Sequence, residues 1–277
     1  MKQSLISIFL SCLMVGHAAA MTDARATLGF ADSLVSEKFF NEALIEYKRA
    51  LSLSPDLKKD PFVMEKYLMA SLLGTTPLQA LENVRSLIQS DITPEVSCVA
   101  KYFEGRVLYD LANYKQALVS FKHVQSFCGD PWKGHASYWA GLTSLWTEDW
   151  KNSLSDFSTI PLTSVWYVNA QRGMIRAQNG PRIHWKSEGK AAGLNAILPG
   201  TGYWYAGSPQ TGVASFITTG LFGWGTVASI RSGNSGAAAV LGLFSLAWYF
   251  GGIYGAGAAA NRYNFFIKKG WTNLDND

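Results

Sequence analysis

Residues 105–124, GRVLYDLANYKQALVSFKHV, decide the fold of the N-terminal half of this chain. Apolar residues at helical spacing lie on both sides of a short stretch around Asn113, which predicts two helices joined by a tight turn. The small residue Ala117 lies where the two helices would touch, and the ring of Phe121 follows one helical turn later. The stretch therefore predicts an antiparallel helix pair with its apolar faces turned inward.

The same arrangement repeats along residues 24–161 at intervals of 36 or 37 residues. The small residue at the helix contact recurs as Ala43, Ala80, Ala117 and Ser153. Four and seven positions after each of them come larger or apolar residues, namely Tyr47, Val84, Phe121 and Phe157, then Ala50, Leu87, Val124 and Ile160. Because one helix pair cannot bury its apolar face alone, about four pairs are expected to stack into an all-α solenoid, capped by a further helix at residues 165–179.

This periodicity resembles the tetratricopeptide repeat (TPR). The third unit has the signature residues Gly105, Leu108, Tyr114, Ala117, Phe121 and Val124. The fourth unit has Gly141, Trp150, Ser153, Phe157, Ile160 and Pro161, and the first has Ala31, Leu34, Phe40, Ala43, Tyr47, Ala50 and Pro55. The second unit is degenerate, with Leu68 and Ser71 in its first helix. We therefore expect a TPR-like repeat domain over residues 21–181.

The resemblance also implies that the first helix of each unit lines a concave groove. Its groove positions fall on Arg25, Asp32, Glu65, Tyr102, Arg106, Tyr109, His135 and Tyr138. Aromatic and arginine side chains suit a surface that binds a protein segment, here of another envelope protein. The alternative is an ordinary solvated face with some packing inside the solenoid.

The first twenty residues have the layout of a secretory signal peptide. Lys2 is followed by an apolar run over residues 5–16 and by the small residues Ala18, Ala19 and Ala20. This predicts export and a mature chain that begins near Met21, with an uncleaved anchor as the alternative.

Cleavage would leave two cysteines, Cys98 and Cys128, symmetric about Asn113 at the start and end of one helix pair. An oxidising compartment permits a disulfide between them, and closing a loop of this length contributes roughly 3–4 kcal/mol. The alternative is two separate small buried residues.

The C-terminal part of the chain has a different composition. Residues 191–261 contain one charged side chain, Arg231, and 15 of the 26 glycines. Two apolar runs, at about 211–230 and 236–260, are each long enough to cross a hydrocarbon layer of about 30 Å as a helix. We therefore expect a membrane domain over residues 182–277, a glycine-rich transmembrane hairpin with a short polar tail. Such helices also suit homo-oligomer contacts.

The segment PGTGYWYAG, residues 199–207, precedes the first apolar run. It resembles the opening of the small two-helix membrane domains of the TM2-like kind, which occur in bacterial proteins of unknown function. The matching residues are Pro199, Gly200, Gly202, Tyr205 and Gly207. The resemblance implies a tight turn that leads into the first spanning helix.

The distribution of charged residues leaves the membrane topology of the C-terminal part open. Two crossings after a cleaved signal would return Arg262, Lys268 and Lys269 to the periplasmic side, against the usual preference of basic residues for the cytoplasm. A third, partial crossing by residues 191–207 would remove the conflict, but that segment is short and interrupted by Pro199 and Gly200. Two crossings are the favoured prediction.

Several function classes have no support in the sequence. A formal net charge of +4 does not predict nucleic-acid binding. No paired carboxylates, nucleophile motif, metal-ligand spacing or phosphate loop can be found, so we expect no catalytic residue, cofactor or metal. Asp149 and Asp156, in the turn and second helix of the fourth unit, are expected to face solvent.

The sequence predicts a non-enzymatic scaffold or adaptor of the bacterial cell envelope. Its repeats would lie in the periplasm, tethered to the inner membrane, with the outer membrane as the alternative location. The alternative function is an oligomeric pore or channel-like protein, for which the hydroxyl groups of residues 211–226 would supply a polar face (Thr211, Ser215, Thr218, Thr219 and Thr226).

Overall fold

The computed structural model of the protein describes residues 22–274, which form helices and turns without a β-strand. The predicted signal peptide at residues 1–20 lies outside these residues. The chain divides into two compact units between Gln178 and Asn179, close to the boundary predicted at residue 181. We call them the repeat unit and the hairpin unit and describe each by itself.

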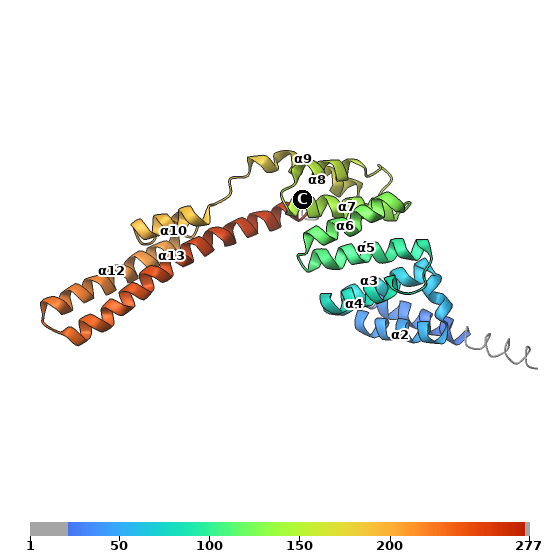
Figure 1. The fold of residues 1–277 in the computed structure, drawn as a ribbon, viewed down its shortest axis with the longest axis horizontal. Coiled ribbons are helices and arrows are strands. Elements are labelled where there is room, and N and C mark those ends of the chain that lie inside the picture. The colour runs from blue at the N-terminus through green and yellow to red at the C-terminus, as the bar shows by residue number, and fades with distance from the viewer. Residues whose placement is uncertain (1–21, 275–277) are drawn as a thin grey trace, which may run out of the picture. The chain divides into compact units, whose positions relative to one another are not determined.

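Four helix pairs build the repeat unit (Figure 1). The first pair is the helix of residues 22–36 and α2 (Phe40–Leu53). A short 3₁₀ helix, η1 (Pro55–Lys59), leads to the second pair, α3 (Pro61–Gly74) and α4 (Pro77–Ile88). The third pair is α5 (Pro94–Asp110) with α6 (Tyr114–Phe127), and the fourth is α7 (Trp132–Trp146) with α8 (Trp150–Ser158). The predicted capping helix is present as α9 (Tyr167–Asn179). The fold is an α-solenoid.

Capping side chains mark where several of these helices begin. Asp60, Thr76, Thr93 and Asp149 each accept a hydrogen bond from a backbone N–H of the first turn of the following helix. Proline occupies the first helical position of α3, α4 and α5, where its fixed φ is favourable and its missing N–H costs nothing. Pro94 therefore begins a helix, and α4 has already ended at Ile88.

The repeat marks of the sequence form the core of the solenoid. Ala43, Ala80, Ala117 and Ser153 have no exposed surface, and the residues four and seven positions later are buried as well. A Cβ atom added to Gly105 would lie 2.5 Å from the ring of Phe121. Phe157 has the same relation to Gly141, at 2.7 Å, and to Gly173 of α9, at 2.5 Å. The absence of a side chain at these glycines is what allows each aromatic ring to lie against the neighbouring helix.

One turn conformation joins the helices of the first, third and fourth pairs. Its central residue has a positive φ, +67° at Lys38, +57° at Ala112 and +64° at Glu148. In the third pair the N–H of Asn113 donates to the carbonyl of Leu108 over 2.8 Å, which satisfies the end of α5. The second pair, the degenerate unit of the sequence pattern, instead joins its helices through Thr75 and Thr76 before Pro77.

The prediction that Asp156 faces solvent is wrong. Asp156 is 3% exposed, and its carboxylate accepts hydrogen bonds from Lys122 and Gln125 of α6. These bonds connect the second helices of the third and fourth pairs, so the aspartate satisfies polar groups between two repeats. Asp149, in contrast, is exposed and caps α8.

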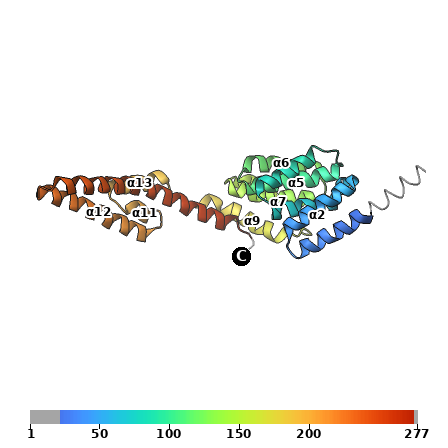
Figure 2. The same ribbon diagram turned by 90° about the horizontal axis from the view of Figure 1, so that it is seen from below.

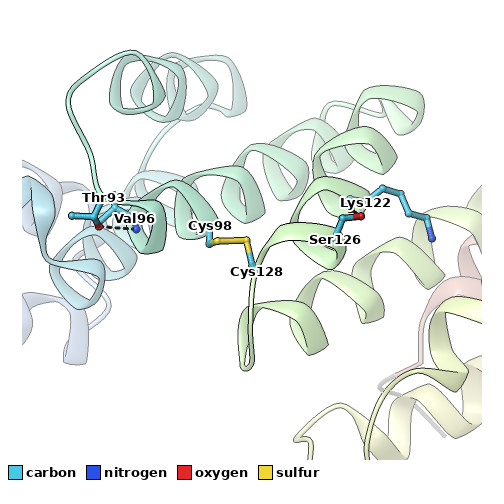
Figure 3. The surroundings of a disulfide bond; sticks show 6 residues. All are labelled: Thr93, Val96, Cys98, Lys122, Ser126 and Cys128. Atoms are coloured by element: carbon cyan, nitrogen blue, oxygen red, sulfur yellow. Dashed lines mark hydrogen bonds between the residues drawn. A yellow bond between two sulfur atoms is a disulfide. The ribbon is translucent and has the colours of Figure 1, made fainter.

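A disulfide joins Cys98 on α5 to Cys128 at the end of α6 (Figure 3). The Cα atoms are 5.9 Å apart, within the range that a disulfide bridges. The antiparallel arrangement of the two helices brings these cysteines together, because the turn near Asn113 lies midway between them. The bond closes the third repeat at the end remote from its turn.

The hairpin unit contains two helices that are long and apolar enough to cross a membrane, α12 (Pro209–Arg231) and α13 (Ser235–Thr272). They run side by side in Figures 1 and 2, and only 6% of the most apolar window of each is buried. Two short helices, α10 (Glu188–Ile197) and α11 (Thr201–Tyr205), precede them. Residues 191–207 thus form no third long helix. The α13 helix extends beyond the predicted span that ended at residue 260.

Replacing Gly105 with alanine is expected to lower the free energy of unfolding by about 1–3 kcal/mol, because the new methyl group overlaps the ring of Phe121. Gly29 is the matched control: it is also helical, but nothing lies within 4 Å of its added Cβ. Gly29→Ala should raise the free energy of unfolding by about 0.5–1 kcal/mol. Urea titration of the full chain in detergent, followed by tryptophan fluorescence, measures both. Equal effects of the two substitutions would contradict this packing.

Candidate partner-binding site

Five of the eight predicted groove residues lie together on two neighbouring first helices. On α5, Tyr102, Arg106 and Tyr109 follow one another at helical spacing, and on α7 His135 and Tyr138 do the same. The rings of Tyr102 and His135 have centroids 5.7 Å apart. This part of the predicted groove is therefore a continuous surface formed by the third and fourth repeats.

A row of tryptophans on α7 completes this surface. Trp132, Trp139 and Trp146 are spaced seven residues apart and are all half-buried. The ring of Trp132 lies 5.3 Å from that of Tyr102, and the guanidinium carbon of Arg106 lies 3.4 Å above the centre of the Trp139 ring. We call Trp132, Trp139 and Trp146 the tryptophan row. Sequence reasoning missed it, although the spacing of seven on one predicted helix was a visible signal.

The aromatic contacts continue at both ends of the row. Tyr109 lies 5.3 Å from Trp139 and 5.6 Å from Tyr114, whose ring lies 5.7 Å from Trp146. At the other end, His135 contacts Trp166, which stacks on Tyr138 with ring centroids 4.3 Å apart. Such pairs hold the rings in fixed positions beyond what their burial alone would do.

Burial divides the predicted groove residues into two groups. Tyr102 is 5% exposed and packs against Trp132 and His135 of α7, and Tyr138 is 3% exposed and packs against Phe157 of α8 and Trp166. Arg106, Tyr109 and His135 are half-buried, as is the tryptophan row. The accessible part of this surface therefore consists of these half-buried side chains.

The remaining predicted groove residues lie on the first two repeats. Asp32 accepts hydrogen bonds from the Tyr47 hydroxyl and the Lys66 ammonium, each over 2.6 Å. Glu65 is half-buried on α3, and burial raises the pKa of its carboxyl. Arg25 is exposed on the first described helix. Asp32 thus belongs to a polar network of the first two repeats, whereas Glu65 acts on Tyr102 of the aromatic surface, where burial raises the pKa of the Tyr102 hydroxyl and the charge of Glu65 adds to this rise.

Arg106 is the electrostatic centre of the aromatic surface. Burial raises the pKa of the hydroxyls of Tyr102 and Tyr109 and of the Asp110 carboxyl, and the positive charge of Arg106 opposes each of these shifts. The Nε atom of Arg106 is buried and has no acceptor among the described residues. A guanidinium stacked on an indole in this way offers its other N–H groups to carboxylate or carbonyl oxygens.

The motif of residues 199–207, PGTGYWYAG, has a local structural reason for each of its glycines. Gly200 has a φ of +95° and Gly207 one of +79°, which other residues seldom adopt. A Cβ added to Gly202 would lie 2.0 Å from the carbonyl oxygen of Ala191. The side chain of Asn195 accepts a hydrogen bond from the N–H of Gly200 over 2.8 Å. After Pro199, the motif therefore builds a compact connection between α10 and α12.

Tyr205 of that motif makes a contact with a residue 18 positions earlier in the sequence. Its hydroxyl accepts a hydrogen bond from the N–H of Ser187 over 3.0 Å, which fixes the start of α10. The motif is thus a structural feature of the hairpin unit.

Within residues 22–274, no group of three or more His, Cys, Asp or Glu side chains could hold a metal ion. Comparison with known proteins gives no further assignment: no family model, no curated protein and no solved structure matches the chain.

The half-buried His135 predicts a pH dependence of stability. Burial lowers its pKa below the usual 6.5, and the charge of Asp130 only partly opposes this. Below pH 6.5 the unfolded chain therefore binds a proton more readily than the folded chain, so stability falls as the pH drops from 6.5 towards the folded-state pKa. His135→Gln should remove this component from urea unfolding curves measured between pH 7 and 5.

His123 is the matched control, since it is exposed on α6. His123→Gln should leave the profile of the wild-type chain unchanged. If the wild-type and His135→Gln profiles run parallel over this range, His135 is not held neutral by burial.

Proposed function

We propose that this protein is a non-enzymatic scaffold or adaptor of the bacterial envelope, anchored in the inner membrane by its hairpin unit. Its TPR-like repeat unit would lie in the periplasm and bind a segment of another envelope protein. The observation that carries the proposal is the half-buried surface formed by the tryptophan row with Arg106 and Tyr109.

The chemistry of this surface suits a protein partner. Tryptophan, tyrosine and arginine are the residues that most often dominate binding energy at interfaces. Here their rings are held in place by neighbouring aromatic contacts, so little side-chain entropy remains to be lost on binding. The charge of Arg106 favours a segment that brings a carboxylate or a main-chain carbonyl to the centre of the surface.

Two further observations support the location. The unburied apolar surface of α12 and α13 favours insertion into a bilayer, where both helices satisfy their own backbone polar groups. The Cys98–Cys128 disulfide favours an oxidising compartment, as does the signal-peptide pattern of residues 1–20. The outer membrane remains the alternative location.

The alternative function, an oligomeric pore, has narrower support. Ser215 and Thr219 have buried hydroxyls without an acceptor among the described residues, which would suit a polar face. Thr226, however, donates to the carbonyl of Phe222 within its own helix, and Thr211 is exposed. Conductance of the reconstituted protein in planar bilayers separates the two functions, because a scaffold gives none.

A photocrosslinking amino acid at position 139 should capture a specific envelope protein in cells, and the same amino acid at position 127 should not. Phe127 is the matched control, an aromatic residue 77% exposed on the second helix of the third pair. In the chain that carries the photocrosslinking amino acid at position 139, Arg106→Gln should reduce the amount of cross-linked product by about tenfold, because it removes one interface hot spot.

Lys115→Gln on α6 controls for loss of one exposed charge and should leave the cross-link unchanged. Thermal melting of both variants shows whether the repeat unit stays folded. Equal capture from positions 139 and 127, or a cross-link insensitive to Arg106→Gln, would exclude this surface as the binding site.

A further inference from the structure

Basic residues gather at one end of the hairpin unit. The described part of this unit contains one acidic residue, Glu188, and a larger number of basic residues. The basic residues are Arg182, Lys186, Lys190, Arg231, Arg262, Lys268 and Lys269. Only Arg231 lies at the turn between α12 and α13. We call Lys186, Lys190, Arg262, Lys268 and Lys269 the basic collar. Asp275 and Asp277 follow in the sequence, outside the described residues.

Packing between distant segments brings the collar together. Ala191 of α10 is buried in a cluster with Ala256, Ala259 and Ala260 of α13. Next to it, the Asn264 side chain accepts from the N–H of Lys186 and donates to its carbonyl, both over 2.8 Å. The start of α10 and the distal part of α13, 78 positions apart in sequence, are thus fixed to each other.

Aromatic rings accompany the basic groups. The Lys186 ammonium lies 4.9 Å from the ring centre of Tyr205 and 5.5 Å from that of Tyr263. The Lys268 ammonium lies 5.6 Å from the ring of Trp185. Tyrosine, tryptophan and lysine are the residues that gather at the level of lipid headgroups.

The apolar surface of both helices ends at the collar. On α10, Lys190 is exposed, and Leu194 and Ile197, on the same face one and two turns further, are 41% and 85% exposed. On α13, the rise from Gly236 to Ala256 spans about 30 Å, the thickness of a hydrocarbon layer. Arg262 then lies about 9 Å beyond Ala256, at headgroup depth.

The positive charge at the collar end of the hairpin unit is opposite to the usual distribution of basic residues on the two sides of a membrane. This step rests on the proposed function, in which the repeat unit lies in the periplasm. The collar then faces the periplasm as well, whereas basic residues normally collect on the cytoplasmic side. Topology therefore does not explain why these charges are there, and a ligand of opposite charge does.

We propose that the basic collar binds the phosphate-bearing headgroups of anionic phospholipids in the leaflet facing the repeat unit. Exposed Lys190 and Arg262 contact the phosphates, and Lys269, about 10 Å further along α13, adds its positive charge at longer range. Lys186 and Lys268, held near aromatic rings, position the two segments. Such attraction is additive over the basic residues and is weakened by salt.

The test uses the full chain in nanodiscs of equimolar phosphatidylglycerol and phosphatidylcholine, with the retained lipids counted by native mass spectrometry. The wild-type chain should retain phosphatidylglycerol over phosphatidylcholine by about tenfold or more, and Lys190→Gln/Arg262→Gln/Lys269→Gln should bring the ratio near one. The matched control, Lys48→Gln/Lys115→Gln/Lys151→Gln, removes three exposed charges from the repeat unit and should keep the preference.

A preference that survives the collar variant, or is absent from the wild-type chain, overturns the proposal. Displacement of phosphatidylglycerol by 10 mM inorganic phosphate also overturns it, because the collar would then bind soluble phosphate. Flotation with vesicles of pure phosphatidylcholine tests the membrane anchor separately. If the chain floats with these vesicles but shows no lipid preference in the nanodiscs, only the collar proposal is refuted. If the chain does not float, the membrane anchor of the proposed function is refuted.

Discussion

The ring of Phe157 lies between Gly141 on one side and Gly173 on the other, and the arrangement of the repeat unit depends on contacts of this kind. In the third and fourth pairs an aromatic ring from the second helix occupies the space left by a glycine on the first helix. In the fourth repeat the same ring also receives the capping helix α9. Because each pair exposes an apolar face until the next pair covers it, these contacts decide which helices can be neighbours. The row of first helices that carries the aromatic surface follows from that order.

A second constraint governs the hairpin unit. Because a bilayer offers no hydrogen bonds, a hairpin proposed to cross one would have to satisfy its own polar groups wherever a helix ends near the hydrocarbon. The Asn195 side chain does so for Gly200, and the Tyr249 hydroxyl donates to the carbonyl of Ala196 over 2.6 Å. Gly202 permits this close packing, because any side chain there would overlap α10. The bonds between Asn264 and the backbone of Lys186 bring basic residues of two distant segments near each other.

The helices and the core of the repeats could be predicted from the sequence because they depend on spacing. Ala117 and Phe121 mark a helix contact whatever the details of the neighbouring repeats. The exposure of the groove side chains was harder to predict, because it depends on which aromatic rings from other parts of the chain cover them. Tyr102 and Tyr138 occupy groove positions of the pattern, yet Trp132 and Trp166 cover them.

Contacts between repeats were also missed where the partner lies far away in the sequence. Asp156 is buried because Lys122, 34 residues earlier, reaches it from the preceding repeat. Periodicity within one helix carries no information on such a pair. The apolar run predicted at about 236–260 marks only part of α13, because hydropathy shows where the apolar stretch ends, whereas the helix itself continues to Thr272.

The proposed function requires that the repeat unit and the tip of the hairpin lie on opposite sides of a membrane. Single cysteines at position 29 and at position 232 can be labelled with a membrane-impermeant maleimide, while Cys98 and Cys128 are protected in their disulfide. In intact spheroplasts, Gly29→Cys should react at once, and Ser232→Cys should react only after the membrane is permeabilised. Equal labelling of the two positions, or labelling of position 232 alone, would contradict the account.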